Sequence, residues 1–157
     1  MRYYHGSSFL TASGTVLQGR GHAYEKEWGG TDFYAVLEAY RPAACIPHKE
    51  AVFMCADEDI DSCGGSLDII YELEPLGNVT RHDMNWSSEI SCLLGGGATA
   101  SDPRVVAAAQ AYWNGVPHHN EQVWEYLTRS ARVLRICEDN RDPVPLKTGA
   151  IDSGPEI

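Results

Sequence analysis

The sequence predicts a single α+β domain. Segments with the composition of strands alternate with segments that have the spacing and caps of helices, from Tyr3 to Ile136. At 157 residues the chain has the length of one ordinary domain and can bury most of its apolar surface in one core. We place this domain at residues 1–137. We expect residues 138–157 to form a poorly ordered tail, because that stretch is rich in proline and glycine and has little apolar content.

Composition and charge narrow the classes of partner. The formal net charge of -10, from 22 acidic and 12 basic residues, disfavours a sequence-independent grip on a nucleic-acid backbone. The first residues contain no apolar run typical of a signal peptide, and no stretch approaches membrane-spanning length. We therefore expect a cytoplasmic protein with no membrane partner, which acts on proteins or small molecules.

The five cysteines are an odd number and include no CxxC pair. This spacing argues against a disulfide framework and against a structural zinc site, so we expect reduced and mostly buried thiols.

The first strand is an aromatic segment that leads His5 into a Gly-Ser turn. Residues 11–21 are rich in Gly, Ser and Thr and suit a loop or a short helix. A helix follows at residues 33–40, where apolar residues fall at helical spacing. Thr31 or Asp32 would cap this helix and Pro42 would end it.

The middle of the chain predicts three strands. Residues 51–56 form a continuous apolar run of strand length, closed by an acidic turn. Residues 67–73 form the next strand, which Pro75 and Gly77 end as a turn. Residues 79–86 form a further short strand, and the glycines at 95–97 make the most flexible point of the interior.

The clearest helix covers residues 103–113. Ser101 or Asp102 caps it, Pro103 occupies the first turn, and Gly115 with Pro117 stops it. Two strands at 123–127 and 132–136 complete the domain.

Glu125 is a candidate functional residue. The period of two along a strand places Glu125 on one face with Val123 and Leu127, while Trp124 and Tyr126 lie on the other. A carboxylate between two apolar side chains is unfavourable unless that face opens onto a polar ligand. The alternative is an edge strand whose glutamate faces water.

His5 is the second candidate, because a titratable ring at the end of a strand can form one wall of a ligand site. A strand that merely ends in a polar turn is the alternative, since His and Gly are common there.

Three stretches carry a resemblance to one family. They are Tyr4 to Ser7 followed by Gly14 to Leu17, then Val52 to Ala56 with Ile70 to Gly77, and Trp124 to Leu127 with Val133 to Ile136. In this order they resemble the ADP-ribosyltransferase superfamily, both the poly(ADP-ribose) polymerases and the rifampin ADP-ribosyltransferases. The resemblance implies two small packed antiparallel sheets with peripheral helices and an NAD cleft between them.

The resemblance also implies the site. Glu125 is expected to stabilise the oxocarbenium-like state at the ribose and His5 to bind a ribose hydroxyl, while Gly6 pairs with the nicotinamide carboxamide and Ser7 lies nearby. Phe53 occupies the position of the family's stacking tyrosine.

Two assignments within the site stay open. Tyr71 or Tyr34 is the alternative to Phe53 for the stacking ring. Asp83 competes with Glu125, because the rifampin enzymes use an aspartate located after the Glu-Pro turn.

The implied activity is transfer of ADP-ribose from NAD, as substrate, to an acceptor with release of nicotinamide. We favour a protein acceptor over a small molecule, because the segments 19–31 and 95–101 offer a rim to the site that can recognise the surface of a protein. A non-catalytic module that binds NAD, ADP-ribose or a protein is the second class.

A metal-dependent hydrolase is the third class, with His82, Asp83 and Glu89 as ligands. His118 and His119 form another polar pair. Neither group has the spacing of a helical zinc motif, so we expect polar loop residues at both and no bound metal.

Overall fold

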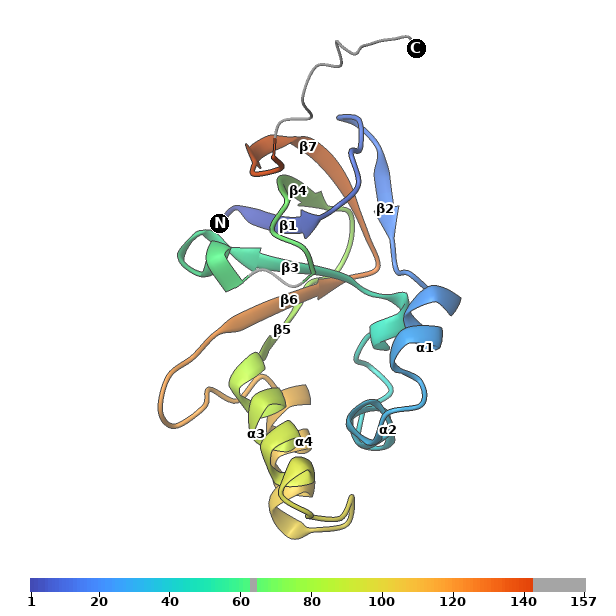
Figure 1. Ribbon diagram of the computed structural model, residues 1–157, viewed down its shortest axis with the longest axis vertical. Helices are drawn as coiled ribbons and strands as arrows, with labels where there is room; N and C mark the ends of the chain where they lie inside the picture. Colours follow the sequence, from blue (N-terminus) through green and yellow to red (C-terminus); the bar gives the residue numbers. More distant parts are fainter. Residues whose placement is uncertain (63–64, 143–157) are drawn as a thin grey trace, which may run out of the picture.

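The opening strand β1 (Tyr3–Ser7) lies in the middle of an antiparallel sheet. The strands that follow are β2 (Val16–Gln18), β3 (Val52–Ala56), β4 (Ile69–Pro75), β5 (Thr80–Asp83), β6 (Trp124–Thr128) and β7 (Ser130–Asp139). In this computed structural model, which describes residues 1–62 and 65–142, they form one seven-stranded sheet in the order β2-β7-β4-β1-β3-β6-β5 (Figure 1).

The helices gather toward the β5 end of the sheet, where α3 and α4 lie side by side (Figure 1). Their bounds are α1 (His22–Trp28), α2 (Asp32–Ala39), α3 (Met84–Gly95) and α4 (Pro103–Trp113), with short 3-10 helices η1 (His48–Glu50) and η2 (Asp57–Ser62). Helices and a large antiparallel sheet together confirm the α+β prediction.

Two helix caps confirm local rules read from the sequence. The Thr31 hydroxyl accepts a hydrogen bond from Tyr34 N at 3.2 Å and starts α2. Asp102 accepts from Arg104 N at 2.9 Å and starts α4, with Pro103 in its first turn. Each cap satisfies a backbone N–H that has no partner within its own helix.

The expected strand over residues 79–86 is wrong in its second half. β5 ends at Asp83, whose carboxylate accepts from Asn85 N at 3.0 Å and caps α3. The cap turns the chain into a helix that the sequence analysis did not expect. The glycines at 95–97 mark the end of this helix: Gly96 is its cap, and Gly97 has a φ of 99°, which favours glycine.

The segment before α2 is more structured than expected. Residues 11–21 contain β2, which pairs with β7, and α1 occupies most of the segment from Gly19 to Thr31. The expected tail also starts later, because Glu138 and Asp139 pair with Ile70 and Ile69 of β4. The remaining residues of that tail, 143–157, lie outside the described residues.

The core has two main parts, one on each face of the sheet. On β6, Leu127 packs with the helices, including Tyr112 and Trp113 of α4, whereas Tyr126 packs with Met54 and Tyr71. The alternation expected for this strand is therefore confirmed, and it puts Glu125 on the same face as Leu127.

Among the cysteines that the structure describes, Cys55 differs from the expectation. Cys55, buried on β3, is disulfide-bonded, whereas Cys45, Cys92 and Cys137 are free thiols. The expectation of reduced thiols is therefore wrong for Cys55. Among residues 1–62 and 65–142, no helix has both the length and the apolar character needed to cross a bilayer.

Candidate functional site

The strands β1 and β3 separate soon after they meet. They pair through Tyr3–Ala56 and Tyr4–Cys55, whereas β1 pairs with β4 along its whole length. Past these pairs, His5 Nδ1 lies 2.8 Å from the Phe53 carbonyl oxygen, so a side chain bridges the two strands. Because a carbonyl oxygen only accepts, Nδ1 carries the ring proton and Nε2 is left with a lone pair.

A cavity of about 620 Å³ lies beside this separation. Its volume falls in the range of small-molecule sites. Five of the residues proposed from the sequence line it, namely His5, Gly6, Ser7, Phe53 and Glu125. The other lining residues are Ser8, Phe9, Arg20, Ala23, Tyr24, Glu27, Trp28, Gly65 and Ser66.

Backbone forms part of the wall of this cavity. Gly65 has a φ of 81°, and a Cβ built on it would lie 3.1 Å from the carbonyl oxygen of Gly6. A side chain at residue 65 would therefore be strained and would press on β1. Two glycines, Gly6 and Gly65, let a ligand approach main-chain polar groups closely.

Glu125 lies partly buried in the wall, between the cavity and α4. Burial raises the pKa of Glu125 to about 7, and the hydrogen bond donated by the Tyr112 hydroxyl opposes this rise. The carboxylate is therefore divided between its two protonation states near neutral pH. Carboxylates at catalytic sites often have such a displaced pKa.

Glu125 is the end of a chain of hydrogen bonds. Tyr112 donates to Glu125 Oε2, so its oxygen accepts from His48 Nε2 at 2.8 Å. His48 Nδ1 then accepts from the Tyr24 hydroxyl at 3.3 Å. His48 stays neutral, because burial lowers its pKa to about 3. Every donor of the chain thus points toward the carboxylate.

The Phe53 ring is covered on one side. Tyr24 stacks on it with ring centroids 5.8 Å apart and an angle of 17° between planes. His48 meets the same ring edge-on, with its centroid at 5.3 Å. The part of Phe53 that lines the cavity is therefore held in place by two aromatic neighbours.

Arg20 gives the cavity a positive charge. Its guanidinium pairs with Glu27 and lies over the Tyr24 ring, 5.5 Å from the centroid. Both members of the ion pair are about half exposed, with side-chain exposures of 52%. An exposed pair of this kind contributes little to stability, so Arg20 can exchange Glu27 for an anionic ligand at small cost.

Three residues considered from the sequence lie outside this set of lining residues. Tyr71 is buried, and its hydroxyl donates to Phe9 O at 2.8 Å and accepts from Thr11 N at 2.6 Å. It holds the loop after β1 in place and does not reach the cavity within the described part of the chain. Tyr34 of α2 packs against Tyr24, with ring centroids 5.9 Å apart, and is not one of the described residues that line the cavity.

Asp83 has a structural role. Its side chain is fully buried and accepts from three backbone N–H groups, those of Asn85, His118 and Val123, at 3.0, 2.8 and 3.1 Å. These bonds join α3 to the segment that leads into β6. Of the two competing carboxylates, Glu125 is the one at the cavity.

The proposed metal group separates into two parts. His82 is buried, with Nδ1 at 2.8 Å from Tyr112 O and Nε2 at 2.9 Å from the Thr80 hydroxyl. Both of its ring nitrogens are therefore already engaged. Glu89 instead meets His118 and His119, so the structure groups the polar residues differently from the sequence.

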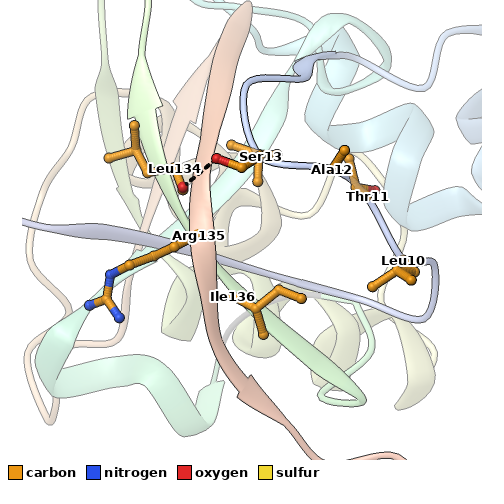
Figure 2. A pocket seen from close by; sticks show the side chains of 8 residues that line it. Leu10, Thr11, Ala12, Ser13, Leu134, Arg135 and Ile136 are labelled. Carbon is orange, nitrogen blue, oxygen red and sulfur yellow. Dashed lines mark hydrogen bonds between the residues drawn. The ribbon is translucent and has the colours of Figure 1, made fainter.

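A second cavity, of about 720 Å³, lies between the loop after β1 and strand β7. Figure 2 shows Leu10 and Ile136 facing each other across it, with the Ser13 hydroxyl donating to Leu134 O at 2.7 Å. Among its lining residues only Arg135 is charged, and Arg135 bonds Glu72 at 2.8 Å. This second cavity is mainly apolar and has no candidate catalytic group.

Sequence reasoning missed the residues behind Glu125. Tyr112 lies within the helix expected over residues 103–113, but neither it nor His48 or Tyr24 was singled out. No local pattern marks them, because their partners are 13, 64 and 24 residues away in sequence. In comparisons with known proteins, the chain matches no family model and no curated protein. Its function is therefore argued from the geometry of the site.

Proposed function

We propose that this protein is an enzyme that transfers ADP-ribose from NAD to an acceptor and releases nicotinamide. One observation carries the proposal: His5, Phe53 and Glu125, from three distant parts of the sequence, line the same cavity together with Gly6 and Ser7. The resemblance to the ADP-ribosyltransferase superfamily implies the same residues at one site.

The proposed fold is the split-sheet arrangement of that superfamily. The short pairing of β1 with β3 supports it, since the sheet is weakest at this junction and the cavity lies beside it. Strands β5, β6 and β3 form one part of the sheet, and β1, β4, β7 and β2 form the other.

Each residue at the cavity has a role in the proposed reaction. The bond between ribose C1′ and the nicotinamide nitrogen breaks, its electron pair neutralises the nicotinamide, and positive charge develops on the ribose. Glu125 in its ionised form stabilises that charge. His5 Nε2 accepts a hydrogen bond from a ribose hydroxyl. The acceptor then attacks C1′ and loses one proton to solvent.

Other residues bind the remainder of NAD. Phe53, held by Tyr24, stacks on the nicotinamide ring, and the Gly6 backbone bonds its carboxamide. Arg20 pairs with the pyrophosphate in place of Glu27, because a guanidinium matches phosphate oxygens well. The negative charge of the dinucleotide is thus met by the cation of the cavity.

A protein remains the favoured acceptor. Helix α1 forms one rim of the cavity through Ala23, Tyr24, Glu27 and Trp28. Trp28 is 37% exposed, and an exposed tryptophan beside a cavity is typical of a surface that contacts another protein.

The test is the release of nicotinamide from NAD by the purified protein, with cell extract as the source of acceptor. We expect Glu125→Gln to lower the rate about 100-fold or more, since this variant loses the charge but keeps an acceptor for the Tyr112 hydroxyl. Glu121→Gln, a neutral variant of an exposed glutamate four residues earlier, serves as the control and should keep the rate. Equal rates in the two variants would remove Glu125 from the catalytic role.

A non-catalytic module that binds NAD or ADP-ribose is the second candidate. The raised pKa of Glu125 favours it, because a protonated carboxyl cannot stabilise a cation. Calorimetry separates the two candidates. If the protein is such a module, the wild type and Glu125→Gln should bind NAD with the same affinity, and neither protein should release nicotinamide.

A further inference from the structure

Glu89 of α3 and the adjacent residues His118 and His119 bring three ligand atoms within 4.8 Å of one another. We propose that these three side chains bind a divalent transition-metal ion, with Zn²⁺ as the expected occupant. Two imidazoles and one carboxylate are a ligand set that zinc accepts, and a fourth position remains for water. This site is separate from the cavity that Glu125 lines, and the proposal does not rest on the proposed function.

The distances suit a small rearrangement on binding. Tetrahedral zinc holds its nitrogen and oxygen ligands about 3.4 Å apart, given bonds of about 2.0–2.1 Å. His118 Nε2 and Glu89 Oε1 are already 3.1 Å apart. Rotation of the exposed His119 ring closes the remaining separation without a change in the backbone.

The loop that carries the two histidines is fixed by hydrogen bonds. Asp83 Oδ2 accepts from the backbone N–H of His118 at 2.8 Å, and Gln122 Nε2 donates to the His118 carbonyl at 2.6 Å. Trp86 Nε1 donates to Val116 O at 2.7 Å and ties the start of the loop to α3. The backbone of His118 is therefore positioned before a metal arrives, which reduces the ordering cost of binding.

The imidazole rings of His118 and His119 and the indole ring of Trp86 pack against one another. The two imidazoles stack with centroids 4.2 Å apart, and Trp86 meets them edge-on at 4.6 and 5.9 Å. His118 is only 8% exposed, whereas His119 is exposed and the Glu89 side chain is 33% exposed. One ligand is thus held in the fold while the other two leave a path for an ion from solvent.

The hydrogen bonds of His118 predict what a metal must displace. Asn120 N donates to Nδ1 at 3.3 Å, so in the neutral ring the proton resides on Nε2 and is donated to Glu89. A metal at Nε2 requires that proton to move to Nδ1, and the long bond from Asn120 is lost. Binding therefore changes the tautomer of His118, with no change in the oxidation state of any group.

The site would join helix α3 to the segment that leads into β6. Glu89 lies in the middle of α3, and the histidines lie on the segment between α4 and β6, the strand of Glu125. The net charge of -10 raises the local concentration of cations around the chain. A bound ion would hold this segment against α3 and stabilise the folded state by mass action.

The test uses the full chain after removal of metals with a chelator, titrated with zinc chloride in a calorimeter. We expect a single zinc ion per chain at micromolar concentration and a rise in melting temperature when zinc is added. His119→Ala and Glu89→Gln should each weaken binding about tenfold or more, because each removes one of the three protein ligands. His22→Ala and Glu121→Gln, which change exposed residues outside the set, should bind zinc as the wild type does.

The tautomer is the second readout. Long-range ¹H–¹⁵N spectra should show the His118 ring proton on Nε2 without zinc and on Nδ1 with it. Absence of zinc binding by the wild type at 100 µM, or an affinity of His119→Ala and Glu89→Gln equal to that of the wild type, would overturn the site. Since His119 is exposed, its variant keeps the fold, which circular dichroism checks.

Discussion

Glu125 combines a partly buried position with a chain of donors that stabilises its charge. Burial alone favours the neutral acid, whereas the Tyr112 hydroxyl favours the anion, and the outcome is a pKa of about 7. His48 fixes the direction of the Tyr112 hydroxyl by donating to its oxygen. At the scale of the residue, the ionisation of one carboxylate therefore decides whether the proposed chemistry proceeds.

The first prediction concerns the pH dependence of that chemistry. We expect kcat/KM for nicotinamide release to rise with pH and to level off above about 7, as Glu125 loses its proton. His5 and His48 do not mask this step, because burial lowers the pKa of both rings from the usual value and so moves their ionisation away from that of Glu125. A profile that is flat between pH 5 and 9 would contradict the assignment of Glu125.

The second prediction is that Tyr112→Phe moves the same profile to higher pH. The variant removes a donor that favours the ionised carboxylate, and a hydrogen bond to a charged group contributes about 1.5–3 kcal/mol, or roughly 1–2 pH units. Tyr34→Phe, which changes an aromatic residue of α2 outside the cavity, is the control. An unmoved midpoint in Tyr112→Phe would mean that Tyr112 only fills space.

At the scale of elements, Asp83 joins three segments that meet near the site. It ends β5, starts α3 and accepts from the backbone of His118 and Val123. A buried carboxylate that accepts from three backbone donors satisfies polar groups of three segments at once. The position of the segment before β6, and with it the position of Glu125, depends on this residue.

The third prediction compares two helix caps. Asp83→Ala should lower the free energy of unfolding by about 3 kcal/mol or more, because three backbone N–H groups, one buried and two partly buried, lose their acceptor. Asp102→Ala, at the half-buried cap of α4, removes the acceptor of one backbone N–H, that of Arg104. This variant should lower the free energy of unfolding by about 1 kcal/mol. Urea denaturation followed by circular dichroism measures both. Similar losses would show that the bonds of Asp83 to the loop add nothing to its role as a cap.

At the scale of the whole molecule, ionisation of Glu125 is unfavourable to folding. The pKa of Glu125 is about 7 in the folded chain, whereas the ordinary value of 4.5 applies to the unfolded chain. As the pH rises, Glu125 therefore loses its proton in the unfolded chain first. Below about pH 4.5 both states are protonated and the residue has no effect. Between about pH 4.5 and 7 the free energy of unfolding decreases as the pH rises, and above about pH 7 it decreases no further on account of Glu125.

The matching prediction is a stability difference that depends on pH. Glu125→Gln should equal the wild type in free energy of unfolding near pH 4.5 and exceed it by about 2–3 kcal/mol at pH 8. Buried histidines such as His48 are common to both proteins and cancel in the comparison. Urea titrations at the two pH values provide the measurement. A difference that does not change with pH would show that the Glu125 carboxyl ionises freely in the fold.

The sequence by itself determined features that depend on near neighbours. The caps of α2 and α4, the strands of the sheet other than β2, and the two faces of β6 follow from side-chain periodicity and from bonds that reach two or three residues along the chain. The helix α3 was missed because its cap, Asp83, had been assigned to the interior of a strand. The resemblance to one family singled out His5, Phe53 and Glu125.

Only the tertiary structure decided which of these side chains meet. It placed His5, Phe53 and Glu125 around one cavity, put Tyr112 and His48 behind the carboxylate, and assigned Asp83 and Tyr71 to holding the fold. It also brought Glu89 to the two histidines. The physical reason is that these contacts join residues far apart in the sequence, 13 positions for Tyr112 with Glu125 and 64 for His48 with Tyr112, so they depend on how the strands pair and the helices pack and not on any local pattern.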